Sequence, residues 1–424
     1  WGRDEVKHAA IGVCVKNVET GQVVYEHNPG MALRPASVVK LLSSALALKR
    51  EGDSLTYTTK VFYTGEIDEG RLLGNIVDPT LDSKYFPKTC FMDSLVSKVV
   101  SLGIKQIHGN IIIETEGEPV RIPGSWPWED VANYYGALYH SFNYRDNTYT
   151  INLKSGKPGT RTKIVSVEPS VPGVKLRNEV MASAKNANDA WIYGGPETAT
   201  LLIQGTIPAN RSSFAVKGAM HHPDACFRAE LEKRLKEKGV LLDKQRIEEG
   251  ERHALLAMDS PFLKDIVYYT NKNSVNLFAE ALGELISPTD YARTVKVELS
   301  HIGIDSCGIT LKDASGLSPA NAVPAEVFTD LLIWAKGHLS DAFVASLPQG
   351  NVDWGLRIYS DHPVLRENVI AKTGSMSGVR ALAGYLKNQK GETLAFTILV
   401  NNYVGDPVKV QETIRDLLKD IADK

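Results

Sequence analysis

A serine and a lysine, Ser37 and Lys40, are the residues of this chain whose types and spacing best suit covalent chemistry. On a helix, residues three apart lie on the same face, one turn from each other. A serine hydroxyl is a weak nucleophile until a base removes its proton, and a buried lysine with a neutral amine can be that base. The Ser-x-x-Lys pattern therefore predicts an acyl-enzyme site, although about one or two such pairs arise by chance in a chain of this length.

The residues around this pair predict the elements that hold it. Apolar residues recur at helical spacing after Lys40 and stop at Gly52, which predicts a buried helix over residues 37–50. Ser37 would then lie at a helix N-terminus, where free backbone N–H groups favour developing negative charge. Alternating, β-branched residues at 9–18 and 22–26 predict a hairpin just ahead of that helix.

A second group of polar residues, Ser274 and Asn276, precedes a helical run at residues 277–285. A hydroxyl and an amide thus lie two residues apart at a predicted helix start. Serine and asparagine are also the residues that ordinarily cap helices, so the pattern carries little weight alone.

A third group, Lys372, Thr373 and Gly374, follows a predicted strand at 369–371 and is followed by Ser375. A lysine and a hydroxyl on a strand edge can bind a carboxylate, and a glycine lets a substrate approach the backbone closely. The same tripeptide is also common in surface turns. The tripeptide becomes informative because it is the last of three motifs that occur in a particular order.

The order of the motifs resembles that of the serine penicillin-recognising enzymes, which are the penicillin-binding proteins and the serine β-lactamases. Ser274 follows Ser37 by 237 residues, which indicates a large insertion between the two motifs. The chain is therefore similar to the D-alanyl-D-alanine carboxypeptidase/endopeptidase family called class C low-molecular-mass penicillin-binding proteins. Other stretches that resemble this family are residues 33–37, 205–208, 274–282, 313–318 and 372–385.

The resemblance implies an α+β fold. It predicts a penicillin-binding/β-lactamase-like transpeptidase domain, an antiparallel sheet flanked by helices, interrupted by inserted mainly-β domains. The expected ranges are 1–58 and 256–424 for the catalytic domain, 59–153 and 199–255 for inserted domain II, and 154–198 for a small inserted domain III.

The resemblance also implies a role for each motif. Lys40 is expected to be the neutral base, with the nearby cation Lys372 helping to depress its pKa. The N–H groups of Ser37 and Ser375 are expected to form the oxyanion hole. Asp146 is an expected contact with the stem peptide, and a solvated turn aspartate is the alternative. The implied catalytic residues are Ser37, Lys40, Ser274 and Asn276, and the implied substrate-binding residues are Lys372, Thr373, Gly374, Ser375 and Asp146.

Composition narrows the range of ligands. A net charge of −2 gives no reason to expect nucleic acid, and no apolar stretch is long enough to span a membrane.

The four cysteines, at 14, 90, 226 and 307, are widely spaced and are expected to be buried thiols, although one disulfide stays possible. His221, His222 and Cys226 could be drawn as a metal site, but no second cluster completes it. No metal and no organic cofactor is expected.

The resemblance implies peptidoglycan stem peptides and β-lactam antibiotics as ligands. It also implies that the protein acts outside the cytoplasm, with the periplasm as the expected compartment. A signal peptide would not be part of the chain as given.

Two alternative functions stay open at this point. A serine β-lactamase shares all three motifs but lacks a large insertion, and a non-catalytic penicillin-binding sensor would bind muropeptide without releasing D-alanine. The oligomeric state is not predicted.

Overall fold

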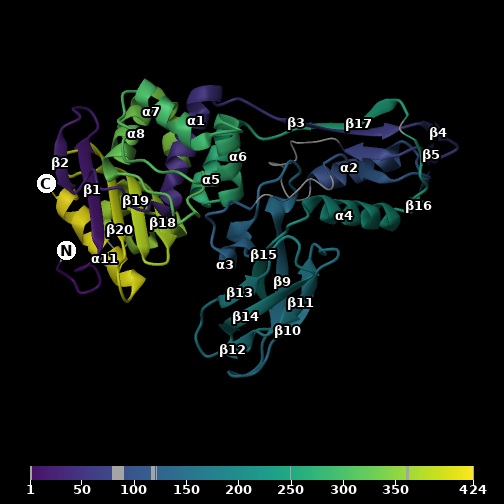
Figure 1. Ribbon diagram of the computed structural model, residues 1–424, viewed down its shortest axis with the longest axis horizontal. Coiled ribbons are helices and arrows are strands. Elements are labelled where there is room, and N and C mark those ends of the chain that lie inside the picture. The colour runs from purple at the N-terminus through teal and green to yellow at the C-terminus, as the bar shows by residue number, and fades with distance from the viewer. Residues whose placement is uncertain are drawn as a thin grey trace. The chain divides into compact units, whose positions relative to one another are not determined.

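The computed structural model describes residues 2–78, 90–115, 120, 122–248, 250–359 and 362–423. Its contacts divide the chain into two compact units (Figure 1). Unit 1 comprises Trp1–Leu55, Pro123–Trp126 and Phe262–Lys424, and unit 2 comprises Thr56–Ile122 and Pro127–Pro261. The finer division into two inserted domains, with its predicted boundaries, stays a prediction.

Unit 1 is built on one five-stranded sheet in the order β18-β19-β20-β1-β2, in which every neighbouring pair is antiparallel. The N-terminal hairpin pairs with strands from the far end of the chain, so that Ala10 lies opposite Asn401. The predicted α+β class with an antiparallel sheet is confirmed. The strands are β1 (Ala10–Asn17), β2 (Val23–His27), β18 (Val369–Met376), β19 (Val379–Lys387) and β20 (Thr393–Asn401).

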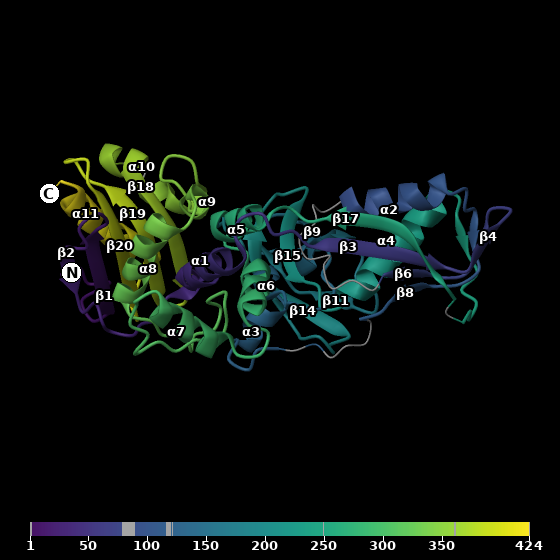
Figure 2. The ribbon, with the colours of Figure 1, turned by 90° about the horizontal axis from the view of Figure 1, so that it is seen from above.

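Helices cover both faces of this sheet (Figure 2). Val13 and Val15 share a core with Val410 of α11 on one face. On the other face, the Thr329 hydroxyl of α8 donates to the carbonyl of Cys14 at 3.1 Å. Strand residues alternate between two covered faces, which is why β20 is buried along nearly its whole length and is mostly apolar. The helices of unit 1 are α1 (Lys40–Glu51), α5 (Leu263–Lys272), α6 (Asn276–Ile286), α7 (Tyr291–His301), α8 (Ala325–His338), α9 (Asp341–Ser346), α10 (Pro363–Asn368) and α11 (Pro407–Ala422), with short 3₁₀ turns η1 (Ala36–Val39) and η5 (Trp354–Tyr359).

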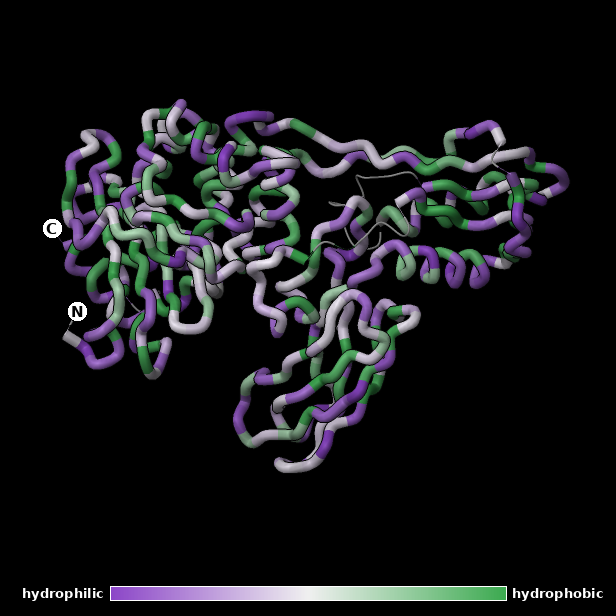
Figure 3. Tube along the Cα trace, in the orientation of Figure 1, coloured by the Kyte–Doolittle hydropathy of each residue, from purple (hydrophilic) through white to green (hydrophobic). Residues whose placement is uncertain are grey.

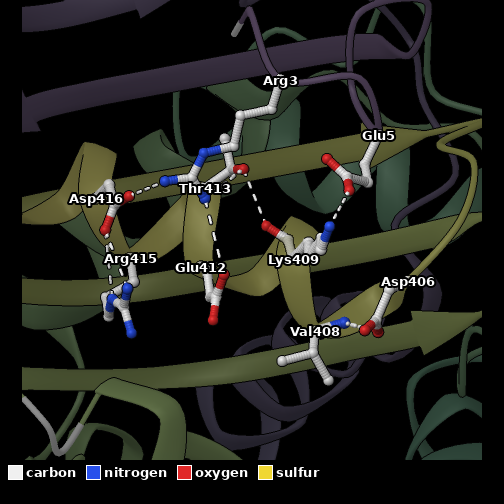
Figure 4. A network of polar contacts seen from close by, with 9 residues as sticks. All are labelled: Arg3, Glu5, Asp406, Val408, Lys409, Glu412, Thr413, Arg415 and Asp416. Carbon is white, nitrogen blue, oxygen red and sulfur yellow. Dashed lines mark hydrogen bonds and ion pairs between the residues drawn. The ribbon is translucent and has the colours of Figure 1, made fainter.

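The residues ahead of β1 are attached to the last helix (Figure 4). Arg3 donates to the Thr413 hydroxyl at 3.3 Å and pairs with Asp416, and Glu5 pairs with Lys409 at 3.2 Å. Ion pairs at such solvent-exposed positions contribute little to stability. The network therefore fixes the path of the first residues more than it stabilises the fold.

In the part of unit 2 that the structure describes, four small sheets and two longer helices surround one core. Its helix α4 is mostly hydrophilic (Figure 3) and buries a stripe that includes Phe227, Leu231 and Leu235. The elements are β3 (Thr58–Thr64), β4 (Glu66–Asp68), β5 (Arg71–Leu73), β6 (Ile76–Asp78), α2 (Cys90–Ser101), β7 (Gln106–Ile107), β8 (Ile111–Ile113), α3 (Trp128–Val131), η3 (Tyr134–Gly136), η4 (Arg145–Asn147), β9 (Thr148–Lys154), β10 (Lys163–Glu168), β11 (Lys175–Asn178), β12 (Met181–Ser183), β13 (Asp189–Tyr193), β14 (Thr200–Pro208), β15 (Phe214–Ala219), α4 (Pro223–Glu237), β16 (Leu241–Leu242) and β17 (Arg252–Asp259).

Within the described ranges, no helix combines the length and the apolar character that crossing a bilayer requires.

Candidate active site

Ser37 lies in a 3₁₀ turn, η1, that leads directly into the buried helix α1. The predicted helix over 37–50 is present, but its first turn is 3₁₀, and regular α-helix begins at Lys40. The helix ends as expected at Gly52, whose φ is 74° and whose N–H donates to the carbonyl of Leu48 at 2.9 Å. Glycine reaches this backbone conformation without the strain that a Cβ imposes.

Two glycines make room for the turn that carries Ser37. A Cβ on Gly316, whose φ is 84°, would lie 2.0 Å from the carbonyl oxygen of Ala36. A Cβ on Gly374 would lie 2.6 Å from the carbonyl oxygen of Pro35 and 3.2 Å from the nitrogen of Ser37. Gly374 was expected to admit a substrate. In the folded chain it also lets strand β18 approach the turn of Ser37.

The Lys40 amine connects the first motif to the second. Its Nζ lies 3.0 Å from Ser37 Oγ, 2.6 Å from Asn276 Oδ1 and 2.5 Å from the carbonyl oxygen of Ser315. A neutral amine has two N–H donors and one lone pair. The amide and carbonyl oxygens can only accept, so they take the two donors. The lone pair then faces the Ser37 hydroxyl, which is the contact that a general base needs.

The third motif meets the second through another buried amine. Lys372 Nζ lies 3.0 Å from Ser274 Oγ and donates to the carbonyl of Thr373 at 2.8 Å. Ser274 sits between α5 and α6 with a φ of 54°. The residue in the N-cap position of α6 is Val275, so Ser274 is not the helix cap that its type allowed. Its hydroxyl lies instead beside Lys372.

Burial sets the charge of both amines. Lys40 and Lys372 are 0% and 1% exposed. Burial lowers the pKa of Lys40 to about 7, although the carboxylates Asp313 and Glu280 act in the opposite direction. Burial, followed by repulsion from Lys40, lowers the pKa of Lys372 well below its usual value. The main cause at Lys40 is thus desolvation rather than the expected influence of Lys372. Because repulsion between two cations is mutual, protonation of one amine disfavours protonation of the other.

Two acids outside the three motifs, the half-buried Glu280 and the buried Asp313, act on the charge of Lys40. Glu280 accepts backbone N–H groups of Ala314 and Ser315 at 3.4 and 2.9 Å. Burial, with repulsion from Asp313, raises the pKa of Glu280 to about 7. A sequence signal for Glu280 existed, since it is an acid one turn after Asn276 inside an apolar helical run.

The remaining predicted residues are placed as follows. Ser375 is exposed on β18, three residues beyond Lys372. Asp146 lies in the 3₁₀ turn η4 of unit 2 with a φ of 55°, so it is not among the residues that unit 1 brings together. Its contact with a stem peptide stays a prediction.

The described residues include no group of three or more His, Cys, Asp or Glu side chains arranged to hold a metal ion. His222 Nε2 lies 3.0 Å from the carbonyl oxygen of Pro196, and Cys226 is a buried free thiol. Cys14 is a buried free thiol as expected, but Cys307 is free and exposed, so the expectation of a buried thiol is wrong at that position. The side chain of Cys90 lies outside the described residues.

We expect acylation of Ser37 to slow about tenfold for each pH unit below roughly pH 7, because only the neutral Lys40 amine accepts a proton. The measurement is the acylation rate constant of a labelled penicillin from pH 5 to 9. A rate independent of pH across this range would contradict Lys40 as the titrating base.

Comparison with known proteins gives a consistent set of relatives. The model of the D-Ala-D-Ala carboxypeptidase 3 (S13) family matches residues 2–424. The carboxypeptidase DacB of Mycolicibacterium smegmatis is 35% identical over 401 residues, covering 92% of this chain and 75% of the relative. The crystal structure of penicillin-binding protein 4 (dacB) from Haemophilus influenzae has a TM-score of 0.81 at 25% identity, covering 99% and 98% of the two chains. The same Haemophilus protein complexed with a novel β-lactam has a TM-score of 0.78 at 23% identity, covering 99% and 98%.

Proposed function

The chain belongs to the D-Ala-D-Ala carboxypeptidase 3 (S13) family, and on that premise we propose that its reaction proceeds through an acyl-enzyme on Ser37. The activity is that of a serine-type D-alanyl-D-alanine carboxypeptidase/endopeptidase acting on peptidoglycan. The observation that carries the mechanism is the Lys40 amine, which lies 3.0 Å from Ser37 Oγ while its other two contacts are obligate acceptors.

In the proposed first step, Ser37 Oγ attacks the carbonyl between the two terminal D-alanines, and Lys40 takes the hydroxyl proton. The N–H groups of Ser37 and Ser375 stabilise the oxyanion, and each such donor is typically worth about 3–4 kcal/mol. Ser274 relays the proton that Lys40 took from Ser37 to the leaving amine, so that the terminal D-alanine departs with its nitrogen protonated and Lys40 is neutral again. Asn276 orients Lys40, a role supported by the 2.6 Å contact between them.

Lys372, Thr373 and Gly374 form the proposed site for the substrate's terminal carboxylate. The amine of Lys372 is buried, and its contact with Ser274 places it next to the proposed proton relay. Water then hydrolyses the ester on Ser37, with Lys40 acting again as the base. A β-lactam would acylate the same oxygen and leave slowly. That β-lactams bind this family is supported by the Haemophilus relative, whose structure is complexed with a novel β-lactam.

Peptidoglycan lies outside the cytoplasm, so the enzyme acts there. We propose the periplasm as its specific compartment. We also propose that the inserted region comprises two domains, 59–153 with 199–255 and the small module 154–198, and that Asp146 contacts the stem peptide. Asp146 is half-buried in the turn η4 of unit 2, where its φ is 55°.

The function is tested by incubating the protein with a synthetic stem pentapeptide that ends in D-Ala-D-Ala and measuring D-alanine. We expect catalytic release of one D-alanine per peptide, and a long-lived adduct with labelled penicillin. Rapid turnover of penicillin without D-alanine release would instead identify a β-lactamase, and binding without either reaction a sensor. In the same assay, Asp146→Asn should raise KM and leave kcat unchanged if that residue contacts the peptide.

A further inference from the structure

Four residues of the inserted region, Pro123–Trp126, belong to unit 1, although the chain on both sides of them belongs to unit 2. Trp126 is only 7% exposed, and its indole Nε1–H donates to Asp313 Oδ2 at 2.8 Å. One residue earlier, the Ser125 hydroxyl accepts from the hydroxyl of Ser318 at 2.8 Å. Both contacts are made to the segment 313–318, which we call the 313–318 loop.

Asp313 is the centre of that loop. Besides the indole, three N–H groups donate to its carboxylate: Gly316 N at 2.8 Å, Ser318 N at 2.6 Å and Asn321 Nδ2 at 2.6 Å. Asp313 is 4% exposed, and within the described part of the chain no lysine or arginine forms an ion pair with it. Four N–H donors therefore compensate for the burial of this anion, and the loss of one leaves a buried acceptor less well satisfied.

The 313–318 loop in turn fixes the proposed base and nucleophile. The carbonyl of Ser315, two residues after Asp313, accepts from Lys40 Nζ at 2.5 Å. Gly316, the next residue, packs so tightly against Ala36 that a Cβ would meet its carbonyl oxygen. A displacement of the loop would thus move the Lys40 amine and the turn of Ser37 together.

We propose that Trp126 is a positioning residue for this reaction: its indole N–H holds Asp313, and thereby the loop whose Ser315 carbonyl holds Lys40. The inserted region then supplies part of the support of the catalytic lysine. The proposal rests on the proposed roles of Ser37 and Lys40. It assigns Trp126 no contact with the reacting atoms.

The test is Trp126→Phe, which keeps a buried aromatic ring and removes the N–H. We expect the acylation rate constant for a labelled penicillin to fall about tenfold, as is typical for loss of a hydrogen bond to a charged group. The dissociation constant of the penicillin before acylation should stay unchanged, because, among the described residues, the hydrogen bonds of Lys372 go to Ser274 and Thr373 and none goes to the loop. Stopped-flow acylation over a range of penicillin concentrations separates the two constants.

The matched control is Trp128→Phe, the same change two residues later at a side chain that is 59% exposed. It should acylate at the wild-type rate. If Trp126→Phe does not fold, Ser125→Ala removes the second contact of the segment and should slow acylation about threefold. A wild-type rate constant in the folded variant would overturn the proposal. The proposal would also be overturned if less of the Trp126→Phe protein were active but the active fraction were acylated at the wild-type rate, because the change would then affect folding alone. Adduct formation on Ser37 together with D-alanine release, in the wild type and in Trp128→Phe, shows that the proposed function stands in either case.

Discussion

Ser37→Ala is expected to form no covalent adduct with labelled penicillin and to release D-alanine at least about 10³-fold more slowly than the wild type. The oxygen that forms the ester is absent, and no other hydroxyl lies at the Lys40 amine among the hydrogen bonds of the described residues. Binding through Lys372 and Thr373 should persist, so penicillin would still compete with the substrate. Intact-protein mass spectrometry detects the adduct directly, and peptide mapping locates it.

The control for this variant is Ser300→Ala, the same change at an exposed position of α7. It should be acylated like the wild type. A covalent adduct on Ser37→Ala at wild-type stoichiometry would show that another residue is the nucleophile.

Lys40→Met is expected to slow acylation by about 10³-fold or more, the size of effect seen when the base of such a unit is removed. Methionine fills a similar space, but it leaves Ser37 without the Lys40 amine as proton acceptor and removes the Lys40 N–H groups that donate to the Asn276 and Ser315 oxygens. The residual reaction should lose its acid limb near pH 7, because the group that titrates there is gone. Stopped-flow or manual mixing with labelled penicillin, at several pH values, measures both effects.

Lys49→Met provides the comparison, since Lys49 lies on the same helix and forms an ion pair with Glu298 away from Ser37. It should keep both the rate and the pH profile of the wild type. An unchanged acid limb in Lys40→Met would mean that a different group controls the reaction.

Much of the site could be predicted from the sequence because its chemistry is carried by short motifs. Ser37 and Lys40 are positioned by one local turn, which the apolar spacing after Lys40 indicated. The helical run predicted at residues 277–285 is present as α6, which begins at Asn276. The contacts of Lys40 with Asn276 and of Lys372 with Ser274 agree with the expectation that three distant motifs meet.

The supporting residues were not predictable in the same way. The hydrogen bond between Trp126 and Asp313 joins residues 187 positions apart, and neither residue type nor spacing indicates that they meet. The 3₁₀ start of the nucleophile helix depends on close packing against Gly374 and Gly316, which is a tertiary effect. For Asp146 the structure describes the position in unit 2, but the contact with a stem peptide is still a prediction.

The surroundings of Lys372 have a consequence for ligand binding. Among the described residues, its hydrogen bonds go to a hydroxyl and a carbonyl, and no carboxylate forms an ion pair with it. A ligand's carboxylate would be its first counter-ion, and that anion would restore the pKa that burial has lowered. Binding would then draw a proton from the solvent, so carboxylate ligands should lose affinity as the medium becomes more alkaline.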